Sequence, residues 1–202
     1  MSRIELDGCE LQLLPVIKGL VSEAEKVKDS MTRFQPDVVG ISISKEGLIG
    51  LREGEYESYE PSDLEMAYGE LLSTFGEVEL PPPCYVVVME LCDARAIPLI
   101  PVDMNEEMFS KAYCELVSGG DLLREGLFAK RAMKKRFDLS SPEAFVKDWD
   151  MRSNRPPGFR KLERQREEHM ASVLRKLCRK HRRVLAVIEE ERSDGVLSIL
   201  ES

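Results

Sequence analysis

Residues His181–Gly195 read HRRVLAVIEEERSDG. Within this stretch, Arg183–Ile188 is a short aliphatic run, which predicts a buried strand. Three glutamates and an arginine, Glu189–Arg192, follow directly where that strand should end. Because open α/β sheets hold their ligands beyond the carboxyl ends of the strands, the stretch predicts both a buried strand and the place of a site.

Three further strands are predicted along the chain, at Glu10–Ile17, Val38–Ser44 and Ile97–Asp103. An apolar stripe at helical spacing runs from Leu20 to Phe34 between the first two, so these strands should form a parallel βαβ unit. A long helix, Phe159–Lys180, leads into the last strand. This alternation predicts a single α/β domain over residues 1–202, with a mostly parallel or mixed sheet of about four strands and helices on both faces.

The segments between these elements are predicted to be loops and helices. Lys45–Pro61 is rich in glycine and acidic residues and predicts a loop, whereas Ser62 and Glu65 form a capping-box pattern that starts a helix. Gly119–Gly120 should end the next helical pattern. Residues 105–154 are therefore predicted to be a helical segment, which could act as a lid over the site.

Composition limits the classes of partner. Lysine and arginine number 29 against 37 acidic residues, a net charge of −8, which argues against nucleic acid and anionic membranes as partners. No apolar run reaches the ~20 residues of a spanning helix, and the first ten residues lack an apolar signal core, so a cytoplasmic location is predicted. The chain has five cysteines but no CxxC pair, so a zinc site is not predicted. It also lacks the GxGxxG and GxxxxGK[ST] motifs of nucleotide-binding proteins, and we therefore predict no bound cofactor.

Arg166 is the most informative residue of the long helix. It falls on the apolar stripe with Leu162, Met170 and Leu174, where an unpaired guanidinium would be costly. Two interpretations are open: the side chain extends outward to solvent, or it reaches an acid or an anionic ligand at the strand ends. Asp103, at the end of a predicted strand, is the expected partner in the second.

Four motifs occur along the chain in the order FQPDVVGISIS, ARAIPLIPVDM, REEHMASVLRKL and RRVLAVIEEERSDGV. Together they resemble the TraB/PrgY/GumN family, which includes the Tiki-type proteases, and the third motif places Arg166 on the family arginine. The resemblance implies an α/β fold and metal-dependent hydrolysis. Three family positions differ, however: Lys18 and Arg192 stand where the family has histidines, and Ser42 stands where it has a glutamate.

Lysine and arginine stay protonated at neutral pH and cannot ligate a divalent metal as imidazole does. The sequence therefore predicts a non-catalytic domain that binds a small anionic ligand or a protein partner at the strand ends, and a homodimer is compatible with this. The predicted binding residues are Lys18, Ser42, Asp103, Arg166 and Arg192.

The alternative is a metal-dependent hydrolase or peptidase with a rebuilt acidic site. In that case Asp103 and Glu189–Glu191 would supply oxygen ligands for Mg²⁺ or Mn²⁺. Consecutive acids on an extended backbone point to opposite faces, which weakens this alternative, and a solvated acidic loop is the simpler prediction for the run. The two histidines, His169 and His181, are not predicted to bind metal.

Overall fold

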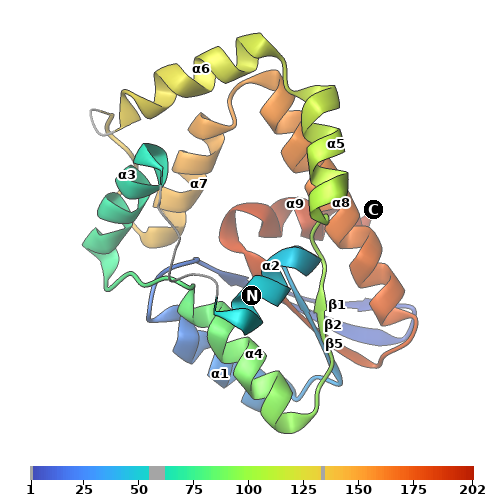
Figure 1. Ribbon diagram of the computed structural model, residues 1–202. Coiled ribbons are helices and arrows are strands. Elements are labelled where there is room, and N and C mark those ends of the chain that lie inside the picture. Colours follow the sequence, from blue (N-terminus) through green and yellow to red (C-terminus); the bar gives the residue numbers. More distant parts are fainter. Residues whose placement is uncertain (1, 55–61, 133–134) are drawn as a thin grey trace.

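A five-stranded sheet forms the centre of the α/β part of the molecule in the computed structural model, which describes residues 2–54, 62–132 and 135–202 (Figure 1). The strand order is β1-β2-β5-β3-β4. The strands are β1 (Ser2–Leu6), β2 (Cys9–Val16), β3 (Val38–Ile41), β4 (Leu99–Pro101) and β5 (Arg183–Glu189). β1 is antiparallel to β2 and all other neighbours are parallel, which confirms the predicted mixed, mostly parallel sheet.

β1 was not predicted from the sequence, although a signal for it is present. Asp7 and Gly8 connect β1 to β2 with φ angles of 52° and 79°. A two-residue turn with positive φ at both positions twists in the same sense as the strands, and Asp-Gly is a preferred sequence for it. The pairing of Leu6 with Cys9 shows that this turn closes a tight hairpin.

Helices cover both faces of the sheet, as predicted. Val184, Ala186 and Ile188 of β5 pack in one core with α8 (Pro157–Cys178) and α9 (Glu190–Glu201). Leu185 and Val187 point the other way, into a second core with α1 (Glu23–Phe34) and α4 (Pro83–Arg95). Alternate residues of a strand face opposite sides of a sheet, so a strand buried on both faces is apolar along its whole length.

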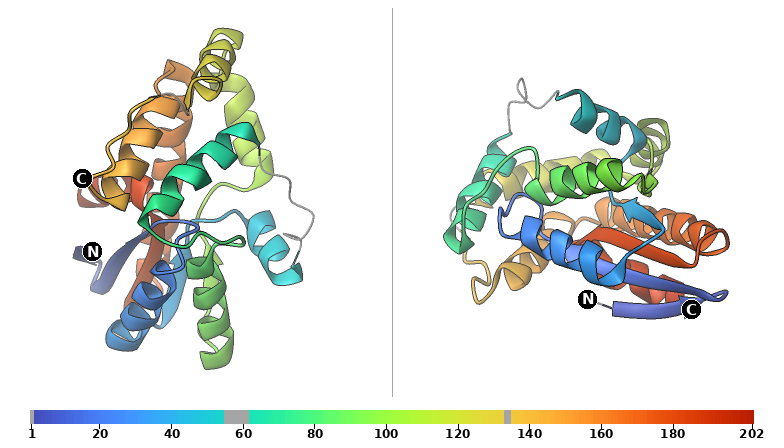
Figure 2. Two further views of the ribbon diagram at one scale, coloured as in Figure 1. Left: turned by 90° about the vertical axis from the view of Figure 1, so that its left-hand side faces the viewer. Right: turned by 90° about the horizontal axis from the view of Figure 1, so that it is seen from below.

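A helical layer extends beyond one end of the sheet. Figures 1 and 2 show α3 (Asp63–Leu72), α6 (Gly119–Ala129) and α7 (Pro142–Ser153) at the end of the molecule opposite α1 and α4. α5 (Glu106–Leu116) packs on α8 beside them, and a short 3-10 helix, Ser73–Phe75, follows α3. An aromatic cluster forms the core of this layer, and its members are Tyr68, Phe75, Phe128, Phe137, Phe145 and Trp149.

Three local predictions were wrong. Lys45–Glu53 forms a helix, α2, whose first turn is capped by the Ser44 hydroxyl accepting from the Gly47 N–H at 2.9 Å; residues 55–61 of the predicted loop lie outside the described residues. Gly119–Gly120 begin α6 rather than ending α5, because Ser118 and Asp121 form a capping box around them. The acidic run is not a loop, since α9 begins at Glu190.

None of the described helices combines the length and the apolar character needed to cross a membrane.

Candidate functional site

A cavity of about 920 Å³ lies where the carboxyl ends of the strands meet the helical layer. Lys18 follows β2, Ser42 follows β3, Asp103 follows β4, and Glu189 ends β5; all four line the cavity. Residues of α3 and α7 form the facing wall. Parallel strands end at the same edge of a sheet, so segments that are far apart in the sequence place these four polar side chains together. We call this side of the cavity, formed by Lys18, Ser42, Asp103 and Glu189, the floor.

Arg166 reaches this floor from α8. Its Nε donates to the two carboxylate oxygens of Asp103 at 3.3 and 3.2 Å, and its Nη2 pairs with Oδ2. Nη1 donates to Glu163 at 2.7 Å. The side chains of Arg166 and Asp103 are only 17% and 9% exposed, so the interpretation that Arg166 extends to solvent was wrong and the predicted pair is confirmed.

Glu189 is the centre of the charged floor. Its Oε1 lies 2.5 Å from Nζ of Lys18, and its Oε2 lies 3.6 Å from Nη2 of Arg166. Its backbone N–H donates to the Ser42 hydroxyl at 3.1 Å, and the Tyr85 hydroxyl lies 2.9 Å from the same oxygen. Burial alone raises the pKa of Glu189, but Lys18 and Arg166 outweigh it and lower that pKa, so Glu189 is a fixed anion at neutral pH.

Glu191, in the first turn of α9, lines the same cavity, but its pKa is shifted in the opposite direction from that of Glu189. Burial and then the negative charge of Glu189 raise its pKa to about 7, and Lys18 offsets this only in part. Glu190, which lies between them in sequence, does not line the cavity and pairs with Lys147 at 3.0 Å. The acidic run thus places two carboxyl groups in the cavity, one ionised and one that titrates near neutral pH.

Arg192 is not brought to this floor. Its side chain is 4% exposed and pairs with Asp150 of α7 and with Glu163 and Glu167 of α8, the last two at 3.3 Å. It lines a separate hollow between these helices. Four of the five predicted binding residues therefore converge on one cavity, and the fifth holds α9 to the helical layer.

The apolar walls of the cavity were not predicted. Tyr68 of α3 and Trp149 of α7 pack edge to face, with ring centroids 5.3 Å apart, and both line the cavity. Tyr85, Phe109 and several aliphatic side chains complete the lining. The sequence predicted helices in both of these segments, but it gave no sign that their apolar faces meet over the strand ends.

The floor does not suit a metal ion. Among the described residues, no group of three or more His, Cys, Asp and Glu side chains is placed to hold one. Asp103 and Glu189 do lie close together, but the guanidinium of Arg166 pairs with both of them. A divalent cation at this position would have to displace a charge that already neutralises these carboxylates.

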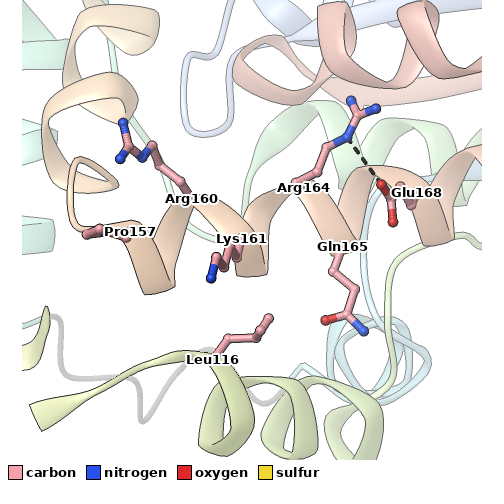
Figure 3. Close-up of a pocket in the computed structure, with 7 residues that line it drawn as sticks. All are labelled: Leu116, Pro157, Arg160, Lys161, Arg164, Gln165 and Glu168. Atoms are coloured by element: carbon pink, nitrogen blue, oxygen red, sulfur yellow. Dashed lines mark ion pairs between the residues drawn. The ribbon is translucent and has the colours of Figure 1, made fainter.

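A second hollow lies on the outer face of α8, next to the end of α5 (Figure 3). Arg160, Lys161 and Arg164 project from the helix there, and Arg164 pairs with Glu168 at 3.3 Å. The side chains of that pair are 52% and 57% exposed, so their charges remain in contact with solvent. The larger cavity at the strand ends, with its buried charged side chains, is therefore the better candidate site.

Replacing Glu191 by glutamine should stabilise the protein in a pH-dependent way. The raised pKa means that the folded protein keeps a proton that the unfolded chain loses above about pH 4.5, so this group's contribution to stability falls as pH rises to about 7. Glutamine cannot ionise beside Glu189. We expect Glu191→Gln to have little effect near pH 5 and to raise the free energy of unfolding by about 1 kcal/mol or more near pH 8.

Urea denaturation at several pH values measures this difference. Glu168→Gln, which removes an exposed carboxylate of α8, is the control and should give a small difference that does not change with pH. An equal effect of Glu191→Gln at both pH values would contradict the prediction.

No family model and no curated protein matches the chain.

Proposed function

We propose that this protein binds a small organic molecule in the cavity at the strand ends and does not catalyse a reaction there. One observation carries the proposal: four strands and α8 deliver polar side chains to the floor of a single cavity of about 920 Å³ with apolar walls. Concave, mostly apolar cavities with a few convergent polar groups are typical of small-molecule sites. The ion pairs between those groups hold the floor in one arrangement, which favours specific binding.

The state of Lys18 supports a binding role over a catalytic one. Burial alone lowers the pKa of Lys18, but Glu189 and Glu191 outweigh it and raise that pKa above its ordinary value. Lys18 thus stays protonated and paired with Glu189, and it can serve neither as a base nor as a metal ligand. The resemblance to the TraB-like family, which stays an expectation, would place this lysine where hydrolysis needs a histidine, and this favours the same proposal.

The alternative, a metal-dependent hydrolase with a rebuilt acidic site, has less support. Its proposed ligands Asp103 and Glu189 are already paired with Arg166, and Glu190 points out of the cavity. Only Glu191 would remain, and one carboxylate is a weak ligand set for Mg²⁺ or Mn²⁺.

Filling the cavity should abolish binding without harming the fold. Gly69 of α3 lines the cavity, and a Cβ added there would meet no atom within 4 Å, so phenylalanine can extend into the space. Gly126 of α6 is equally open but does not line the cavity, which makes Gly126→Phe the matched control. Both changes replace a helical glycine, so neither should lower stability through helix propensity.

Trp149, the single tryptophan of the chain, provides the signal for the titration. We expect phenethyl alcohol, a neutral amphipathic probe, to change the fluorescence of Trp149 saturably in the wild type and in Gly126→Phe. In Gly69→Phe the affinity should fall at least about tenfold. If the probe binds Gly69→Phe as well as Gly126→Phe, the proposed function is wrong.

A further inference from the structure

Acidic side chains outnumber basic side chains in the lining of the cavity. Among the residues that the structure describes, the lining contains two cations, Lys18 and Arg166, against a larger set of acids, which are Glu65, Asp103, Glu106, Asp150, Glu189 and Glu191. Both cations are engaged, Lys18 by Glu189 and Arg166 by Asp103, Glu163 and Glu189. An anionic ligand would have to compete with these carboxylates for their partners. The arrangement is therefore unfavourable for the small anion that the sequence alone predicts.

Glu191 is a mostly buried carboxyl group of the lining that this network leaves available, whereas Glu65 and Glu106 are exposed. None of the ion pairs among the described residues involves Glu191, although its side chain lines the cavity and is mostly buried in the floor. The cation that acts on it most strongly is Lys18, whose ammonium is held 2.5 Å from Glu189. A buried carboxylate without a counter-ion is unstable, so a cation that enters the cavity would supply what the protein does not.

The aromatic wall beside this carboxyl group also favours a cation. Tyr68 and Trp149 pack together on the wall, and the charges of Glu191, Glu189 and Asp150 add to burial in raising the pKa of the Tyr68 hydroxyl. The aromatic pair therefore lies within the electrostatic field of these carboxylates. Aromatic faces attract ammonium groups, most strongly where water is excluded, and they also accommodate an apolar body.

Building on the proposed function, we propose that the ligand of this cavity is an organic cation, an ammonium group on an apolar body. The ammonium pairs with Glu191, and the apolar body packs against Tyr68 and Trp149. Asp150, on the same side of the cavity, adds to the negative potential although it is paired with Arg192. The ion pairs of Lys18 and Arg166 remain intact when such a ligand binds.

Binding should depend on pH through Glu191. The charged or titratable groups that act on it from the surrounding elements are Glu189 of β5, Lys18 after β2, Asp150 of α7, Tyr68 of α3, Tyr85 of α4 and Arg192 of α9. A cation binds the ionised carboxylate, so binding should release a proton and the affinity should rise as pH increases through about 7.

Three probes that share one phenethyl body separate the ligand classes. They are phenethylammonium, phenethyl alcohol and hydrocinnamate, and each is titrated against the Trp149 fluorescence near pH 8. We expect the cation to bind about tenfold more tightly than the alcohol, in line with a charge-assisted hydrogen bond. Hydrocinnamate should bind more weakly than the alcohol.

Glu191→Gln should reduce the preference for the cation over the alcohol to about twofold or less and remove its pH dependence. Glu168→Gln removes the same charge from the exposed face of α8 and should leave the preference unchanged, which separates a local pair from the general attraction of a protein with net charge −8. If phenethyl alcohol binds but the cation binds no better, or if Glu191→Gln keeps the preference, this inference is wrong while the proposed function stands. If none of the three probes binds, both are wrong.

Discussion

Replacing Arg166 by leucine should lower the free energy of unfolding by about 3 kcal/mol or more. Arg166 is the shared counter-ion of Asp103, Glu163 and Glu189, and its side chain is 17% exposed. Leucine would suit the apolar stripe of α8 but would leave these mostly buried carboxylates close together without a counter-ion. Removing one partner of a buried pair typically costs about 3–5 kcal/mol because the remaining charge stays buried.

A double-mutant cycle with Asp103→Asn tests the cause of this loss. Each single change should be destabilising, and the double change should cost less than the sum, because the two residues share one interaction. Arg52 and Asp93 form an exposed Arg–Asp pair at 2.9 Å, with side chains 45% and 54% exposed. The cycle Arg52→Leu with Asp93→Asn is the control and should show a coupling near zero and below about 1 kcal/mol.

Full additivity at Arg166 and Asp103, or a neutral Arg166→Leu, would contradict the prediction. Either result would mean that the charged floor of the cavity is not held by this pair. Chemical denaturation, with the denaturant slopes compared among variants, is the measurement.

Arg192→Leu should have an effect of similar size, about 3 kcal/mol, that depends on pH. The Arg192 side chain is 4% exposed and is the counter-ion of Asp150, Glu163 and Glu167. Without it, three acids from α7 and α8 would face one another. Arg192 lies in the first turn of α9, where the helix dipole disfavours a positive charge, so its removal relieves an unfavourable interaction that is smaller than the lost ion pairs.

The pH dependence follows from the carboxyl groups. Burial raises the pKa values of Asp150, Glu163 and Glu167, and Arg192 lowers them again in part. Removing Arg192 raises them further, so these acids can be neutralised by protons as the pH falls. We expect the loss of stability to be largest near pH 8 and clearly smaller near pH 5.

Arg164→Leu provides the matched control on the neighbouring surface. Arg164 pairs with Glu167 at 3.6 Å and with Glu168 at 3.3 Å, but its side chain is 52% exposed. Its replacement should change stability by less than about 1 kcal/mol at either pH. A loss at Arg192 that is small, or that grows toward acid pH, would show that Arg192 is not the counter-ion of this cluster.

The sequence was sufficient to predict four of the five strands, and it offered the Arg166–Asp103 pair as one of two interpretations of Arg166. Strands such as Arg183–Glu189 are buried on both faces. A strand of this kind needs apolar residues at consecutive positions, so it can be recognised in the sequence as an unbroken aliphatic run. The position of Arg166 on an apolar stripe called for either a route to solvent or an acidic partner, and the rule that parallel strands end at one edge made Asp103 the expected partner. Both predictions depend on patterns that are local in sequence or on a general property of parallel sheets.

The direction of Arg192 and the walls of the cavity were decided only by the tertiary structure. α9 begins directly after β5, and successive residues of an α-helix lie about 100° apart, so Glu191 faces the cavity while Arg192 turns toward α7 and α8. Tyr68 and Trp149 lie on separate helices whose apolar faces require burial but do not specify a partner. Periodicity records which face of a helix is buried, whereas the packing of the whole chain determines what that face meets.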